Sequence, residues 1–185
     1  LTPTTLSGIT MNFLMSLSGG LLAGYVISNK DPFWTYSSGL AGIICASAGN
    51  DLYHPLQSMV IAMVGVVIMH RLHFWVERRF KIDDAVGAVA VHGYAGVVGL
   101  VICGFVLWGY PSSGYWDTPI NPVGMIIGAI IMFGLLGLLP GYVIAKILNS
   151  MGKLRIPKEV ELAGMDFDTM EAAKNDQKVY AAAEK

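Results

Sequence analysis

The stretch Asp83-Asp84-Ala85-Val86-Gly87-Ala88-Val89-Ala90-Val91-His92-Gly93-Tyr94-Ala95-Gly96 sets one imidazole inside a long apolar run, shortly after a pair of carboxylates. An ionisable side chain in a membrane interior is costly unless it faces protein or a water-filled cavity, so it marks a functional site by default. The residues beside His92 are small, which lets neighbouring helices approach closely. The stretch therefore predicts a helix of a membrane bundle whose histidine lines a conduit.

The composition of the whole chain excludes a soluble domain. Of its 185 residues, 54% are hydrophobic and only 14% are charged, and the mean hydropathy is +0.57. Soluble domains carry about 25% charged residues. We therefore predict an all-α, polytopic transmembrane helical bundle in contact with membrane lipid, with no nucleic-acid partner. Cys45 and Cys103 lie inside apolar runs, where thiols act as small hydrophobes, so no disulfide is expected.

Five apolar runs are long enough to predict membrane-spanning helices. Their expected bounds, to about ±4 residues, are 4–28, 33–49, 55–75, 85–109 and 119–148. Proline in Asp31-Pro32, His54-Pro55 and Thr118-Pro119 suits the first turn of a helix, where its missing N–H costs nothing. We expect residues 1–148 to form a transmembrane domain and residues 149–185 a tail.

The basic residues lie on one side of this five-span arrangement. All 12 Lys and Arg occur at Lys30, within 71–81, or from Lys146 onward, and the connections 50–54 and 110–118 contain none. The positive-inside rule then predicts a cytoplasmic tail, and we expect a multi-pass protein of the cell membrane. It also predicts that Leu1 lies outside, so we expect further helices of the same protein before it.

Small residues at helical spacing predict close packing of the spans, as in Gly20-xxx-Gly24 and Gly124-xxx-Gly128. The second span ends in a small, polar, poorly helical stretch, 45–51, and is short for a full crossing. Such backbone is tolerated only where it lines a cavity or is buried in protein. Ser47 is therefore a second candidate for the conduit wall. The alternative is a hydroxyl bonded to a carbonyl one turn earlier.

Four stretches resemble the ammonium transporter/Rhesus family in their order and spacing. They are Ser38-Gly39-Leu40-Ala41-Gly42-Ile43-Ile44 with Ser47; Ile82-Asp83-Asp84 with 91–99; Gly104-Phe105; and Leu154-Arg155-Ile156-Pro157-Lys158-Glu159 with 161–166. Together they are similar to the C-terminal half of the family, about helices seven to eleven plus the cytoplasmic tail. Residues 1–37 resemble the seventh helix only loosely.

The resemblance implies a homotrimer of eleven-span protomers built from an inverted repeat, each with its own hydrophobic pore. His92 matches the pore histidine of the second repeat, and the partner histidine belongs to the half outside this chain. Two departures stand out. Ala48 replaces a common proline, and 168–173 reads Asp-Thr-Met-Glu-Ala-Ala instead of the His-Gly-Glu element of the tail. The second departure bears on contact with a PII-type regulator.

The expected substrate path is lined by His92, Ser47, Ala88 and Gly96. At 1.5 Å per residue His92 lies about 12 Å beyond Asp84 along a helix. The small residues at 88, 95, 96 and 99 should share its face and leave room for a small solute. Moving NH4+ through hydrocarbon faces a penalty of order 20 kcal/mol in the idealised limit, whereas NH3 avoids most of it. An imidazole can accept and donate a proton near neutral pH.

The other polar residues have structural interpretations. Asp83 and Asp84 are expected to act as N-cap and first-turn acid of the fourth span, or as an acid at the inner mouth. His70, His73 and Glu77 have a spacing that could bind metal, but the arginines among them favour an amphipathic segment facing lipid headgroups. We expect neither a metal site nor a cofactor.

Transport of ammonium or ammonia is the leading functional hypothesis, and enzymatic activity is not expected. The alternatives are an ammonium sensor with the same fold and a noncatalytic structural subunit of a larger membrane complex. A haem-binding bundle would need axial histidines from two core helices, and only His92 lies deep in an apolar run.

Overall fold

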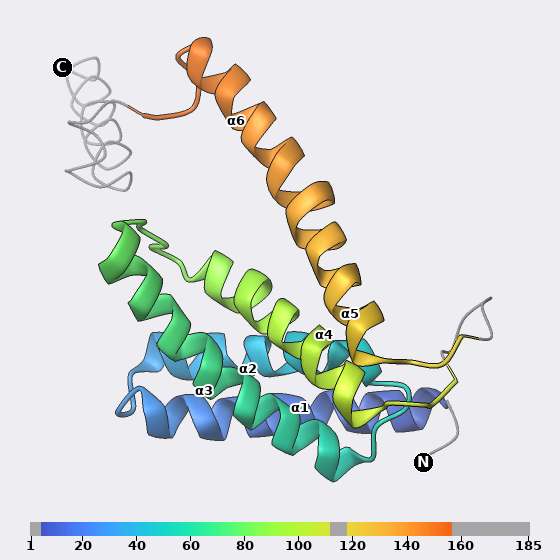
Figure 1. Ribbon diagram of the computed structural model, residues 1–185. Coiled ribbons are helices and arrows are strands. Elements are labelled where there is room, and N and C mark those ends of the chain that lie inside the picture. Colours follow the sequence, from blue (N-terminus) through green and yellow to red (C-terminus); the bar gives the residue numbers. More distant parts are fainter. Residues whose placement is uncertain (1–4, 112–117, 157–185) are drawn as a thin grey trace, which may run out of the picture. The chain divides into compact units, whose positions relative to one another are not determined.

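The computed structural model describes residues 5–111 and 118–156, which are helical throughout apart from turns, short connections and one isolated bridge (Figure 1). The chain divides into two units, residues 1–136 and residues 137–185, and each is described by itself. Four helices in the described ranges are long and apolar enough to cross a membrane: Leu6–Ile27, Pro55–Phe80, Val89–Val106 and Pro122–Ser150. The predicted class, a multi-span helical membrane protein, is confirmed.

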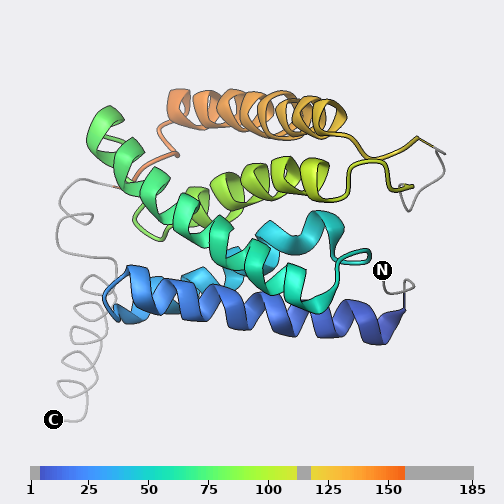
Figure 2. The same ribbon diagram turned by 60° about the horizontal axis from the view of Figure 1, so that its bottom comes forward.

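Three helices form the first part of unit one: α1 (Leu6–Ile27), α2 (Pro32–Ala46) and α3 (Pro55–Phe80). Each packs against the other two, and the two ribbon views show them side by side (Figures 1 and 2). Gly20 lies against the backbone of α2 at Ser38 and Gly42, and Gly24 lies against the Ser38 side chain. The glycines at helical spacing therefore serve the close packing that the sequence predicts.

Two of the three proline-marked helix starts are confirmed. At α2, the Trp34 N–H donates to Asp31 Oδ1 (2.8 Å), and Pro32 occupies the first turn. At α3, the Leu56 N–H donates to His54 Nδ1 (3.2 Å), while the His54 N–H donates to Gln57 Oε1 (2.9 Å). This reciprocal pair satisfies two backbone donors that the helix itself leaves unpaired.

The second predicted span is the shortest helix of the first three. The 15 residues of α2 are followed by a 3₁₀ turn, η1 (Ser47–Gly49). At 1.5 Å per residue in α2 and 2.0 Å in η1, the two together rise about 28 Å, close to the thickness of a hydrocarbon core. The segment therefore needs its tighter last turn to approach a full crossing.

A buried asparagine ties α1 to the connection between α2 and α3. Asn12 is only 1% exposed, and its Nδ2 donates to the backbone carbonyls of Asn50 (2.7 Å) and Tyr53 (2.8 Å). In return, Asn50 Nδ2 donates to the Ile9 carbonyl (3.3 Å). The two amide groups thus supply donors to backbone carbonyls of the connection and of α1.

The rest of unit one comprises the π-helix η2 (Val89–Tyr94), α4 (Ala95–Val106), α5 (Pro122–Ala129) and most of the π-helix η3 (Ile130–Leu138). α4 packs against α2, α3 and α5. Gly99 lies directly on the Cys45 backbone, and Gly65 of α3 lies on the Cys45 sulfur. Cys45 and Cys103 are both buried and unbridged, as expected.

The prediction that Pro119 lies in the first turn of the last span is wrong. The helix begins with Asn121, whose Oδ1 accepts from the Gly124 N–H (2.7 Å), and with Pro122 in its first turn. Pro119 is extended and pairs with Pro111, while Ile120 exchanges backbone hydrogen bonds with Gly109 (2.9 Å) and Tyr110 (2.8 Å). This pairing across the connection between α4 and α5 holds Pro119 outside the helix, which begins three residues later.

Unit two contains α6 (Leu139–Ser150), which ends in a turn where Gly152 has φ +66° and the Lys153 N–H donates to the Leu148 carbonyl (2.9 Å). A positive φ at this position suits glycine, which lacks a Cβ. The predicted tail beyond residue 156 lies outside the described residues, including the family-like stretch 157–166 and the divergent stretch 168–173.

We expect Gly99→Ala to lower the free energy of unfolding by about 1–3 kcal/mol, because the added Cβ would overlap the Cys45 backbone, which cannot move aside as a side chain can. Thermal unfolding of the full-length protein in detergent measures the change. Gly128→Ala is the matched control, since no atom lies within 4 Å of its Cβ position. Equal unfolding temperatures for the two variants would contradict this packing.

Candidate functional site

His92 lies in η2, where the helix winds more loosely than an α-helix. Ala90 and Val91 turn into the protein and are buried, whereas His92 is exposed on the surface of the described unit. Single π-turns inside α-helices are rare and occur frequently at functional sites. The histidine thus sits within a membrane-spanning helix, on a face that the described residues leave uncovered.

Asp84 holds the start of this helix. The Gly87 N–H donates to the Asp84 carbonyl (2.8 Å), and Gly87 has φ +64°, which closes a turn that returns the chain over the carboxylate. The Val89 N–H then donates to Asp84 Oδ1 (3.2 Å) and the Ala90 N–H to Asp84 Oδ2 (2.9 Å). A negative group at a helix N-terminus also benefits from the helix dipole.

The two acids are not the N-cap and first-turn acid that the sequence predicts. The helix begins at Val89, within the expected margin around Ala85, so Asp83 and Asp84 both precede its first turn. Asp84 nevertheless caps the helix from within the preceding turn. The Asp83 side chain is exposed.

His73 does not face lipid headgroups as predicted; it is 5% exposed. Helix α3 continues without a break to Phe80, so the stretch after Trp75 is not a separate amphipathic segment. The His73 ring packs against Trp34 (4.6 Å between ring centroids) and Phe74 (4.9 Å), and its Nδ1 lies 3.7 Å from Asp84 Oδ2. The sequence did not predict this arrangement, because it joins side chains of α2, of α3 and of the connection after α3.

His70 belongs to the same cluster of rings, with centroid distances of 5.2 Å to Trp34 and 4.9 Å to Phe74. Within residues 5–111 and 118–156, no group of three or more His, Cys, Asp or Glu is arranged to hold a metal ion. His70 and His73, whose spacing resembles that of metal ligands, pack against the rings of Trp34 and Phe74.

Ser47 opens η1 and is exposed. Its Oγ donates to the Ile43 carbonyl (2.7 Å), which is the local bond that the sequence offered as the alternative to a wall residue. That bond occupies the hydroxyl proton and leaves the oxygen lone pairs available as acceptors.

The expectation that the small residues share one face with His92 is wrong in part. Ala88 is exposed, but Ala95 and Gly99 are buried, because the π-turn rotates the residues after His92 away from its face. Gly96 is half-buried, and its Cβ position lies 2.8 Å from Cζ of Phe133. The space expected beside Gly96 is therefore filled by a phenyl ring.

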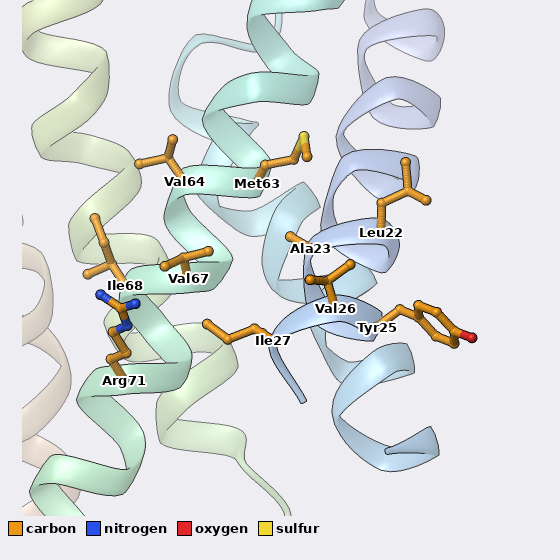
Figure 3. A pocket seen from close by; sticks show the side chains of 10 residues that line it. All are labelled: Leu22, Ala23, Tyr25, Val26, Ile27, Met63, Val64, Val67, Ile68 and Arg71. Carbon is orange, nitrogen blue, oxygen red and sulfur yellow. The ribbon is translucent and has the colours of Figure 1, made fainter. Parts of the chain in front are cut away.

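Apolar grooves among the described residues lie away from His92. One, about 580 Å³, runs between α1 and α3, with Met63 and Val67 facing Leu22 and Val26 and with Arg71 at one end (Figure 3). Another, about 290 Å³, lies between α4 and the helix that contains Phe133. His92 lines neither of these grooves, so the candidate site rests on the exposed face of η2.

Comparison with known proteins gives a consistent result. Residues 2–175 match the model of the Ammonium Transporter Family. The chain is 29% identical over 163 residues to ammonium transporter Amt1 of Methanocaldococcus jannaschii, a match that covers 87% of this chain and 40% of the relative. It is 31% identical over 157 residues to Amt2 of the same organism, covering 83% of this chain and 36% of that protein.

An ammonium transporter of Bacillus subtilis is 26% identical over 178 residues, covering 88% of this chain and 44% of the relative. The chain thus spans well under half the length of these relatives. No solved structure matches it.

We expect Asp84→Ala to lower the free energy of unfolding by about 1–2 kcal/mol, because two backbone donors at the start of η2 lose their acceptor. Chemical unfolding of the full-length protein measures the loss. Asp83→Ala, which removes the same charge from an exposed neighbour, should change it by less than about 0.5 kcal/mol. A larger loss in Asp83→Ala than in Asp84→Ala would show that the cap is misassigned.

Proposed function

Because this multi-pass membrane protein belongs to the Ammonium Transporter Family, we propose that it forms part of a path by which ammonium or ammonia crosses the membrane, with His92 lining that path. The observation that carries the proposal is an exposed imidazole on a π-turn inside a membrane-spanning helix. An ionisable side chain at this depth would be costly if it faced lipid.

The chemistry follows from the cost of charge in hydrocarbon. Full dehydration of NH4+ in a low-dielectric passage is prohibitive, with a penalty of order 20 kcal/mol in the idealised limit. Neutral NH3 avoids most of that penalty and can both donate and accept hydrogen bonds. The imidazole of His92 offers one acceptor and one donor nitrogen, so it can exchange a hydrogen bond with passing ammonia without carrying a charge itself.

The exposed face of η2 presents His92, an ionisable side chain that is costly in contact with lipid, so other helices should pack over it. Curated relatives are more than twice as long as the matched region, and we propose that helices outside this sequence pack over His92 and complete the passage. This chain then supplies the C-terminal half of the protomer. In the same proposal the protomer assembles as a homotrimer in the cell membrane, with residues 149–185 on the cytoplasmic side and available to a PII-type regulator.

Of the remaining candidate wall residues, Ala88 has the stronger support because it is exposed on the same segment as His92. Ser47 contributes an acceptor oxygen at the end of the short α2. Gly96 is a wall residue only where Phe133 is displaced, since the phenyl ring occupies its open side.

We expect His92→Ala in the full-length protein to reduce methylammonium uptake into proteoliposomes by about tenfold or more, the size of one lost hydrogen bond in a path without water. His70→Gln is the control, because His70 lies in the ring cluster on α3 and outside the proposed path. Uptake by His92→Ala at the unaltered rate would remove the imidazole from the mechanism. Ammonium binding without any uptake by the unaltered protein would favour a sensor.

We expect Ser47→Ala to reduce uptake about threefold with little change in unfolding temperature, since its hydroxyl makes one local bond and offers an acceptor to the path. Ser18→Ala is the matched control, because the Ser18 hydroxyl makes the same bond to Leu14 (2.7 Å) on α1. An equal change in both variants would assign Ser47 a purely local role.

A further inference from the structure

His73 and Asp84 form a pair that no step of the proposed transport path requires. The His73 Nδ1 lies 3.7 Å from Asp84 Oδ2, the same oxygen that accepts the Ala90 N–H. Only 6% of the His73 side chain and 12% of the Asp84 side chain are exposed. The two side chains therefore meet in a part of the structure that solvent hardly reaches.

The imidazole is held in this position from two helices. Trp34 of α2 and Phe74 of α3 pack on it, with ring centroids 4.6 and 4.9 Å away. The rings restrict the rotation of His73 and leave Nδ1 directed to the Asp84 carboxylate. The arrangement joins α2, α3 and the start of η2 at one point.

We propose that His73 is a positioning residue for the transport path: it holds Asp84, and through Asp84 it fixes the first turn of the helix that presents His92. The proposal rests on the function proposed above for His92. His73 touches neither the substrate nor His92. It acts through the two hydrogen bonds by which Asp84 caps η2, and the second of those bonds ends at Ala90, two residues before His92.

Other ionisable groups surround the pair and belong to the same electrostatic unit. His70 lies one turn before His73 on α3 and feels the charges of His73 and of Asp31 at the start of α2. Tyr94 of η2 feels the charge of Asp84. Glu77 follows His73 by one turn on α3. Of these groups, His73 is the imidazole in ion-pair contact with Asp84.

Amide hydrogen exchange of the full-length protein, read on peptides that cover residues 84–94, tests the hold directly and independently of transport. His73→Phe fills the ring cluster without a polar atom toward Asp84, and its protection should be about tenfold lower than that of the unaltered protein. His73→Gln keeps a polar group at this position and should retain more protection than His73→Phe.

His70→Gln is the matched control, since His70 packs on the same rings without contacting Asp84, and it should retain the protection of the unaltered protein. Unaltered protection in His73→Phe would overturn the proposal. An equal loss in His70→Gln would also overturn it, because the effect would then belong to the ring cluster.

The link to transport is read from methylammonium uptake. We expect slower uptake in His73→Phe, partial rescue in His73→Gln and the unaltered rate in His70→Gln. An unaltered rate in His73→Phe, with lost protection, would overturn the link to the path. A wild-type rate in His92→Ala would instead overturn the proposed function, and the exchange measurements would still decide whether His73 holds Asp84.

Discussion

The capping of η2 by Asp84 is the constraint on which the candidate site depends. The first N–H groups of a helix have no partner within the helix, and burying them unpaired is costly. The Asp84 carboxylate, folded back by the Gly87 turn, supplies acceptors to Val89 and Ala90. The helix therefore begins at a defined residue, and the side on which His92 emerges follows from that start.

Glycine packing supplies the second requirement, the close approach of α4 to α2 and α3. Dispersion contacts hold membrane helices together, since lipid gives no hydrophobic drive for helix association. Contact between Gly99 and the Cys45 backbone brings α4 against α2 without an intervening side chain. The helix that contains His92 is thus fixed at its start by the Asp84 carboxylate and farther along by the contact of Gly99 with the Cys45 backbone.

The sequence predicted features that depend on local chemistry, and it failed where other parts of the chain intervene. Hydropathy, Asp31-Pro32 and His54-Pro55 are local signals, and four of the five predicted spans and both helix starts are present. The expected first turn at Pro119 failed because strand-like pairing with residues 109–111 holds Pro119 outside the helix. The common face of His92, Ala95 and Gly99 failed because a π-turn changes the period on which the prediction rested.

The amide of Asn12 has a mechanical consequence for the connection between α2 and α3. Displacing that connection would strip the Asn50 and Tyr53 carbonyls of their buried donor, at about 1–3 kcal/mol for each unsatisfied group. Residues 50–53 therefore form a fixed connection and not a mobile loop. Any opening and closing at this end of the bundle must come from other segments.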